Sequence, residues 1–224
     1  MKTIYKKFDK HEIANLPRVL FPGKIVVVEK PEEAEAAVDF LLGQDILGVD
    51  TETRPSFKKG IRHEVCLLQV STLEVCYLFR LHLLGMTSAI LKLLTDTKVP
   101  KIGLSWHDDL IVLHRRQDFV PGLFIEIQDI AKNFGIEDAS LQKLYANIFH
   151  QKISKAQRLS NWEAKELKEA QKLYAATDAW ACIQLYNAFN ELKENGDYEL
   201  IAPVEEIQEA QVENEVQEAV GEGE

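Results

Sequence analysis

The stretch DILGVDTET, residues 45–53, begins as an apolar strand and ends in acidic side chains. Asp50 and Glu52 are two residues apart, so on a strand they point to the same face, roughly 7 Å from each other. Two carboxylates at the end of a buried strand repel each other and resist removal from water. The stretch therefore marks either a strand that ends in solvent or a site that collects positive charge.

Other short apolar runs flank this stretch, and segments with helical spacing of apolar residues follow them. The strands come early in the chain and then alternate with helices. This order predicts one α/β domain whose sheet is covered by helices on both faces. The predicted strands are residues 24–30, 45–53, 63–72, 74–80, 99–105 and 123–129. The predicted helices run from Pro31 to a break at Gly43, over 84–96, over 107–116, after 129, over 140–148 and over 163–195.

The 224-residue chain has 46% hydrophobic and 28% charged residues, a composition that excludes collagen-like and wholly disordered proteins. Its net charge of −10 is uneven, because the last 22 residues hold eight glutamates and no lysine or arginine. The nearly neutral remainder argues against nucleic-acid binding through charge alone, but not against a grip on phosphate through metal ions. We divide the chain into an N-terminal extension (1–23), a folded domain (24–200) and an acidic, flexible C-terminal tail (201–224).

Targeting signals are missing from the sequence. No stretch approaches the roughly 18 apolar residues of a membrane span, and the N-terminus lacks the apolar block of a secretory signal. The three cysteines, Cys66, Cys76 and Cys182, are far apart and odd in number, which indicates neither a disulfide framework nor a CxxC metal site. We therefore expect a cytoplasmic protein without a membrane partner.

Two further acids occupy positions that invite explanation. Asp109 follows the apolar run VPKIGLS (99–105) at the start of a predicted helix, where an acid also suits the helix dipole. In the last helix, Tyr174 and Asp178 are four residues apart and share the face that carries the apolar stripe. A buried aspartate is costly unless a hydrogen bond, an arginine or a metal ion satisfies it. Asp178 is therefore either a satisfied core residue or part of a site.

Four acids that converge would need cations to offset their repulsion. Oxygen-only ligands select hard ions such as Mg²⁺ or Mn²⁺. Two such ions about 4 Å apart stabilise the attacking and leaving oxygens of a displacement at phosphorus. The sequence contains no histidine or cysteine spacing typical of zinc, no GxxxxGK phosphate loop and no GxSxG. We therefore expect two divalent cations, Mg²⁺ or Mn²⁺, and phosphoryl chemistry.

Three segments resemble the motifs of a known family. GVDTET (48–53), KIGLSWHDDLIVL (101–113) and LYAATDA (173–179) are similar to the three motifs of the DEDD 3′–5′ exonucleases, and the tyrosine before the last aspartate is typical of the DEDDy branch. RLSNW (158–162), followed by QKLYAATDAWACIQLY (171–186), resembles the RNase D and Werner-syndrome exonuclease subgroup. The resemblance covers about residues 24–195. It implies a ribonuclease H-like fold, with a five-stranded mixed sheet flanked by helices, and a 3′–5′ exonuclease domain over 24–200.

The resemblance also implies roles for particular residues. Asp50, Glu52 and Asp178 would hold the first metal ion, and Asp50 would bridge to the second ion, which Asp109 would support. Tyr174 would orient the attacking water. These five would form the catalytic set of an enzyme that hydrolyses phosphodiester bonds from the 3′ end of nucleic acid and releases nucleoside 5′-monophosphates.

The middle motif offers two adjacent acids, and the family spacing favours Asp109 over Asp108. Many family members have asparagine where this chain has Ser105, which puts the contact of that position with the terminal sugar in question. By the same resemblance, Thr51 and Thr53 would lie near the terminal nucleotide and bind substrate.

Basic and aromatic side chains could extend the substrate site, although most such residues are solvated or packed in a core. Arg158 is the basic residue that we predict to bind substrate. The other basic candidates are Lys152, Lys155, Lys165, Lys168 and Lys172 before and within the last helix, and Arg54, Lys58, Lys59, Arg62 and His63 after the first motif. The tryptophans Trp106, Trp162 and Trp180 are each either base-stacking or core residues.

The resemblance implies that the substrate is a nucleic-acid 3′ end, of DNA or RNA, and it does not indicate protein partners. DNA is slightly favoured, because RNase D proper carries C-terminal helical domains where this chain has an acidic tail. One alternative is RNase D-like trimming of RNA 3′ ends. The other is a non-catalytic member that binds nucleic acid or acts as a scaffold, which the presence of all four acids and the tyrosine disfavours.

Overall fold

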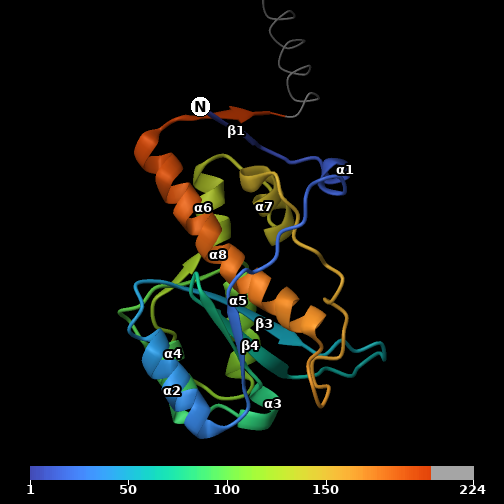
Figure 1. Cartoon of the computed structure of the whole chain (residues 1–224), viewed down its shortest axis with the longest axis vertical. Coiled ribbons are helices and arrows are strands. Elements are labelled where there is room, and N and C mark those ends of the chain that lie inside the picture. Colours follow the sequence, from blue (N-terminus) through green and yellow to red (C-terminus); the bar gives the residue numbers. More distant parts are fainter. Residues whose placement is uncertain (203–224) are drawn as a thin grey trace, which may run out of the picture.

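The computed structural model describes residues 1–202, so the predicted acidic tail lies outside the described residues from residue 203 onward. A six-stranded sheet of order β2-β5-β4-β3-β6-β7 forms the centre (Figure 1). Its strands are β2 (Lys24–Val28), β3 (Leu47–Thr53), β4 (Val65–Ser71), β5 (Val75–Phe79), β6 (Lys101–Gly103) and β7 (Phe124–Glu126). The six strands predicted from apolar runs are all present. The five-strand count implied by the resemblance is wrong here, because β2 pairs in parallel with β5 and adds an edge strand.

The sheet is mixed, as predicted, and one of its ladders is short. β3 runs antiparallel to β4, β4 antiparallel to β5, and β6 parallel to β7. The parallel ladder between β3 and β6 contains only two register pairs, of which Gly48 with Ile102 is the last. Beyond Gly48, the edge of β3 that faces β6 has no strand partner. Asp50 and Glu52 therefore lie on a stretch of β3 that other elements can approach.

Helices cover both faces of the sheet. α8 packs across β3 and β4 on one face, joined by α6 and α7, whereas α2, α4 and α5 pack against the other face (Figure 1). The helices are α1 (Lys10–Ile13), α2 (Pro31–Leu41), α3 (Leu81–Leu84), α4 (Ser88–Thr95), α5 (Trp106–His114), α6 (Ile127–Asn133), α7 (Leu141–Phe149) and α8 (Glu169–Asn195). None of the helices in the described part of the chain is long and apolar enough to cross a membrane.

The last helix begins later than its sequence pattern predicts, at Glu169 instead of residue 163. The guanidinium group of Arg80 is buried and donates hydrogen bonds to the carbonyl oxygens of Ala164 and Lys165. A helix starting at 163 would use these oxygens for its own backbone bonds. Arg80 thereby holds residues 163–168 in a non-helical connection. The predicted helix over 84–96 also begins later, as α4 at Ser88, because Gly85 has a φ of 66° and separates α4 from the short α3.

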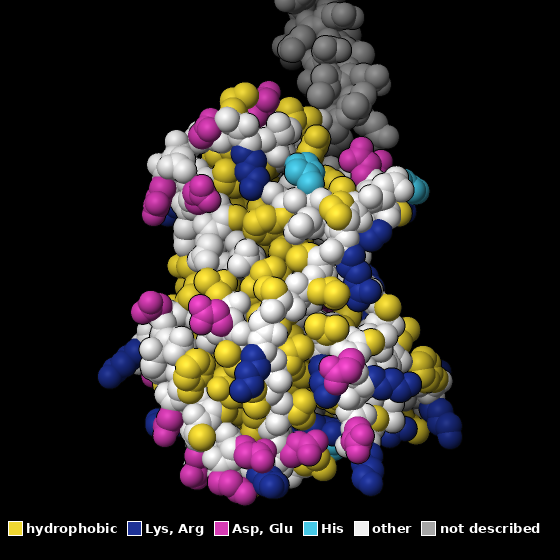
Figure 2. Space-filling model, in the orientation of Figure 1, with side chains coloured by type: hydrophobic (Ala, Val, Ile, Leu, Met, Phe, Trp, Pro, Cys, Tyr) yellow, Lys and Arg dark blue, Asp and Glu magenta, His cyan; other side chains and the backbone are white. Residues whose placement is uncertain are grey.

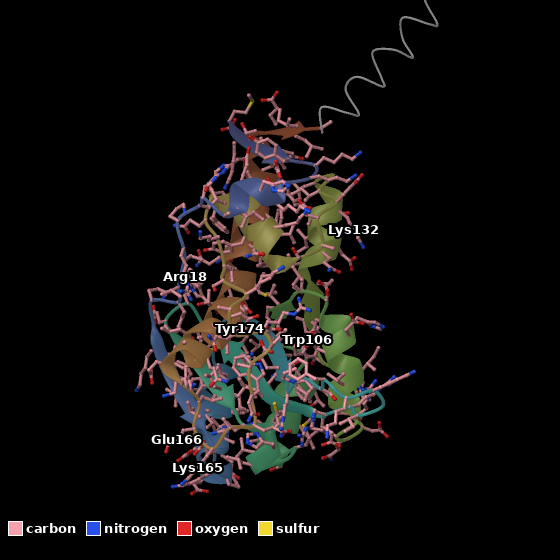
Figure 3. All side chains as sticks on the ribbon, turned by 90° about the vertical axis from the view of Figure 1, so that its right-hand side faces the viewer. Arg18, Trp106, Lys132, Lys165, Glu166 and Tyr174 are labelled. Atoms are coloured by element: carbon pink, nitrogen blue, oxygen red, sulfur yellow. The ribbon has the colours of Figure 1, made fainter. Side chains whose placement is uncertain are left out.

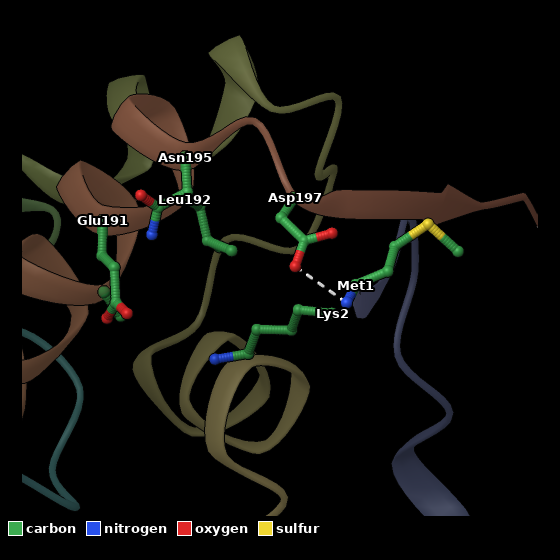
Figure 4. A pocket seen from close by; sticks show the side chains of 7 residues that line it. Met1, Lys2, Glu191, Leu192, Asn195 and Asp197 are labelled. Carbon is green, nitrogen blue, oxygen red and sulfur yellow. Dashed lines mark ion pairs between the residues drawn. The ribbon is translucent and has the colours of Figure 1, made fainter.

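Residues 1–23, set apart as an extension by sequence, pack against the rest of the protein. β1 (Lys2–Tyr5) pairs in parallel with β8 (Tyr198–Ile201), so the two ends of the described chain lie side by side. The Asn147 side chain accepts from the Tyr5 backbone N–H at 2.9 Å and donates to its carbonyl at 2.7 Å. The terminal amine of Met1 lies 2.8 Å from the Asp197 carboxylate, beside a hollow of about 410 Å³ (Figure 4).

Candidate active site

The close packing of α8 on β3 places the acids of the two elements together. A Cβ on Gly48 would stand 2.0 Å from the carbonyl oxygen of Ala179, so only glycine permits this approach. Asp178, the neighbour of Ala179, consequently lies against the strand that carries Asp50 and Glu52. One carboxylate oxygen from each of the three acids lies within 4.8 Å of the other two.

This carboxylate triad, Asp50, Glu52 and Asp178, fits a divalent cation. Asp178 is 6% exposed and Glu52 is 9% exposed. The Oδ1 atom of Asp178 is buried and has no hydrogen-bond partner among the described residues. A buried carboxylate oxygen without a partner is costly, and a cation bound between oxygen ligands would satisfy it. The donors are all oxygen, which suits a hard ion of the Mg²⁺ class.

Tyr174 lies one turn before Asp178 on α8, and its ring is buried beside Trp162, with ring centroids 5.9 Å apart. Its hydroxyl group lies near the Asp178 carboxylate, and it partly offsets the rise that burial causes in the pKa of that carboxyl. Figure 3 labels Tyr174 near the middle of the molecule. The aromatic ring is thus held by the core while its hydroxyl group reaches the acids.

Asp109 reaches the site from α5, on the opposite face of the sheet. Thr51 points to that face because it alternates with Asp50 and Glu52 along β3, and its hydroxyl group donates a hydrogen bond to the Asp109 carboxylate. After burial, the charge of Asp109 is the next cause that raises the pKa of Asp50. The adjacent Asp108 is exposed.

The four acids oppose one another's ionisation. Burial, followed by repulsion from Asp109, Asp178 and Glu52, raises the pKa of Asp50 well above its ordinary value. Burial and the same kind of repulsion raise the pKa of Glu52 to about 9. Burial is also the main cause that raises the pKa of Asp109 to about 7 and that of Asp178 to about 7. The cluster therefore retains protons near neutral pH unless a cation supplies positive charge.

The turn that leads into α5 is held by Glu126, a positioning residue that sequence analysis did not identify. Ser105, just before α5, has a left-handed backbone with a φ of 56°. The Glu126 carboxylate, at the end of β7, accepts hydrogen bonds from the backbone N–H groups of Ser105 at 2.9 Å and Trp106 at 2.7 Å. The Gln128 amide donates to the Ser105 hydroxyl at 2.8 Å. An acid among the apolar residues of the strand predicted over 123–129 was the available signal for Glu126.

The predicted substrate contacts fall into two groups. Thr51 and Thr53 lie on β3 among the acids and are half-buried. Arg158 is exposed, and its charge lowers the pKa of Glu52. The charge of Lys155 likewise opposes the rise in the pKa of Asp178. Three remaining candidates are core residues, because Trp106, Trp162 and Trp180 are all buried.

Comparison with known proteins agrees with this arrangement. A sequence model of the family described as 3′-5′ exonuclease matches residues 25–193. The chain belongs to this family. In this exonuclease domain the first acidic motif lies on β3, the second on α5 and the third on α8.

Individual relatives show how much of the chain this similarity covers. The chain is 34% identical over 188 residues to the mouse bifunctional 3′-5′ exonuclease/ATP-dependent helicase WRN, covering 80% of this chain and 13% of that protein. An Arabidopsis thaliana 3′-5′ exonuclease is 27% identical and shares 85% of this chain and 72% of its own length. The Escherichia coli RNase D structure has the same fold, with a TM-score of 0.66 and 18% identity over 75% of this chain and 45% of its own. The chain thus spans a small part of the mouse protein and most of the plant protein.

Proposed function

We propose that this exonuclease domain hydrolyses the last phosphodiester bond at a nucleic-acid 3′ end and releases nucleoside 5′-monophosphates. The observation that carries the proposal is the carboxylate triad, in which one oxygen of each acid lies within 4.8 Å of the others while Asp178 Oδ1 has no hydrogen-bond partner among the described residues. A pair of divalent cations held there, Mg²⁺ or Mn²⁺, would stabilise charge on the attacking and leaving oxygens and make hydroxide available near neutral pH.

Each residue of the site has a distinct part in this proposal. Asp50, Glu52 and Asp178 would hold the first cation, and Asp50 with Asp109 would hold the second. Asp109 is oriented for this by the Thr51 hydroxyl group.

The ring of Tyr174 is fixed by the core, so its hydroxyl group would hydrogen-bond the attacking water from a rigid position. Its burial, with the nearby carboxylates, raises its pKa, so the hydroxyl group keeps its proton and acts as a donor. It therefore positions the water instead of removing its proton.

The class of nucleic acid is the open choice within this proposal, and we favour DNA slightly. The mouse relative is a 3′-5′ exonuclease joined to an ATP-dependent helicase. RNA is the second candidate, because the E. coli RNase D is an exoribonuclease involved in structured RNA processing. A protein distinguishes RNA from DNA through its contacts with the 2′-hydroxyl group, and Thr51, Thr53 and Arg158 are the residues we propose near the terminal nucleotide.

The test is degradation of matched single-stranded DNA and RNA, each labelled at either the 3′ or the 5′ end, in the presence of Mg²⁺ or Mn²⁺. We expect 5′-labelled strands to shorten in single-nucleotide steps, with no reaction in EDTA and none in Asp50→Asn. The faster polymer identifies the substrate class. If neither polymer shortens although calorimetry shows that Mg²⁺ binds, the protein is a non-catalytic binding or scaffold member instead.

A further inference from the structure

The loop between β3 and β4, residues 54–64, is outside the catalytic set and has an unusual surface. Phe57 is 82% exposed and Ile61 is 48% exposed. Four basic residues and a single acid accompany them over these positions, namely Arg54, Lys58, Lys59, Arg62 and Glu64. An exposed aromatic ring among basic side chains is the combination that single-stranded nucleic acid requires, because bases stack on rings and phosphates attract cations.

The base of this 54–64 loop is fastened to the domain at both ends. Arg54 pairs with Glu163 at 3.1 Å, in the connection before α8. At the other end, Arg116 lies 3.5 Å from the Glu64 carboxylate and donates to the Val65 carbonyl oxygen. The loop therefore leaves β3 after Thr53, the residue next to Glu52, in a defined direction, beside the connection between α7 and α8 (Figure 1).

The tip of the loop, in contrast, is available for a ligand. Its turn is closed only locally, by the Ile61 N–H donating to the Lys58 carbonyl oxygen and by the Ser56 hydroxyl group. Lys58, Lys59 and Arg62 form no ion pair with any residue in the described part of the chain. Figure 2 shows lysine and arginine side chains gathered at the lower right of the molecule, where Figure 1 places this loop.

We propose that the 54–64 loop is a grip for the single strand upstream of the scissile bond: Phe57 stacks on an unpaired base, and Lys58 and Lys59 bind its phosphates. This inference rests on the proposed function, because it assumes that the 3′ end of the same strand lies among the acids. A grip outside the acids makes affinity depend on strand length, since a mononucleotide cannot reach it. It also favours unpaired over paired bases, since a base within a duplex has both faces already stacked.

The experiment compares Phe57→Ala and the double variant Lys58→Ala/Lys59→Ala with the unaltered protein. Binding is measured in EDTA by fluorescence anisotropy with a labelled 12-nucleotide single strand and with a blunt duplex. Hydrolysis is measured on the 12-nucleotide strand and on the p-nitrophenyl ester of thymidine 5′-monophosphate, which has no upstream strand. Val120→Ala removes an apolar side chain that is 81% exposed elsewhere and serves as the matched control, with Lys24→Ala as the basic control.

We expect Phe57→Ala to weaken single-strand binding about tenfold and to leave duplex binding and ester hydrolysis unchanged. The double lysine variant should flatten the plot of log affinity against log salt by roughly 1.4, the value for two lost phosphate contacts on a single strand. Both controls should behave as the unaltered protein does.

Two results would overturn the proposal. If both loop variants bind the strand normally, the loop does not hold nucleic acid and its exposed ring serves a protein partner. If Phe57→Ala slows ester hydrolysis as much as strand hydrolysis, Phe57 acts on the terminal nucleotide and not upstream. Failure of the unaltered protein to hydrolyse either substrate would instead count against the proposed function, and the binding data in EDTA would still decide the role of the loop.

Discussion

The carbonyl oxygen of Ala179 lies 2.0 Å from the point where a Cβ on Gly48 would stand, so α8 and β3 meet backbone to backbone. This single approach sets the separation between Asp178, next to Ala179, and the acids at the end of β3. A change at Gly48 therefore alters both the packing of α8 on β3 and the distances between the acids.

Gly48→Ala should destabilise the protein and impair the site together. The added methyl group meets backbone and not a flexible side chain, so α8 has to shift, at a cost of about 1–3 kcal/mol in the free energy of unfolding. Urea denaturation and calorimetric Mg²⁺ titration measure the two effects. Gly43→Ala is the matched control, because the nearest atom to its Cβ lies 3.5 Å away. Equal behaviour of the two variants would contradict the structural role of Gly48.

The metal-free protein should become less stable as the pH rises. The raised pKa values of Asp50, of Glu52 (about 9) and of Asp178 (about 7) mean that the folded state binds protons more tightly than the unfolded state. This contribution to stability is fully present below the unfolded pKa values, near 4, and is lost as the pH passes through the folded ones. The melting temperature in EDTA should therefore fall between about pH 5 and pH 9.

Adding Mg²⁺ should remove most of that fall, because the cation takes the place of the protons and binds more tightly at higher pH. Mg²⁺ at 100 times its dissociation constant stabilises the folded state by about 2.7 kcal/mol. Glu52→Gln, which keeps the shape of the side chain, should flatten the pH dependence in EDTA. A melting temperature that stays constant or rises with pH in EDTA would refute this prediction.

Thr51→Val should disturb Asp109 without removing it. The Thr51 hydroxyl group lowers the pKa of Asp109 by hydrogen bonding, so its loss should raise that pKa and move the acidic limb of the pH–rate profile to higher pH. Losing a hydrogen bond to a charged group corresponds to roughly tenfold in kcat. Thr51→Ser keeps the hydroxyl group and should retain the normal profile. An unshifted profile in Thr51→Val would show that the bond is unimportant during turnover.

Glu126→Ala should loosen the entrance to α5 and reduce activity through the position of Asp109. The variant leaves the backbone N–H groups of Ser105 and Trp106 without their acceptor, which destabilises the protein by about 1–3 kcal/mol. A second substitution, Ser105→Gly, should restore part of the lost stability, because glycine adopts the left-handed backbone of that residue without strain. The measurements are thermal unfolding and the Mg²⁺ dependence of hydrolysis, with a substitution at the exposed Glu32 of α2, Glu32→Gln, as a control.

Local pattern was enough to find the strands and the acids. Alternation, apolar runs and turn residues depend on near neighbours in the chain, so all six sheet strands and the inward position of Asp178 could be predicted. The start of α8 was not predictable in this way. It depends on Arg80, more than 80 residues earlier, whose guanidinium group takes the carbonyl oxygens that a longer helix would need.

The partners of the termini escaped sequence analysis for the same reason. β1 and β8 are short, and each finds its hydrogen bonds only in the other, at opposite ends of the described chain. The role of Glu126 depends likewise on the backbone N–H groups of Ser105 and Trp106, which follow β6, the strand that neighbours β7.

The sequence by itself determined which residues are candidates for the chemistry, because acids and a tyrosine at these spacings, on elements of these periods, are recognisable from local order alone. Only the tertiary structure decided how they meet. The approach of α8 to Gly48, the hydrogen bond from Thr51 to Asp109 and the direction of the 54–64 loop are contacts between residues distant in the chain. Such contacts arise when the elements pack and when buried polar groups form hydrogen bonds, and a local sequence pattern does not specify either event.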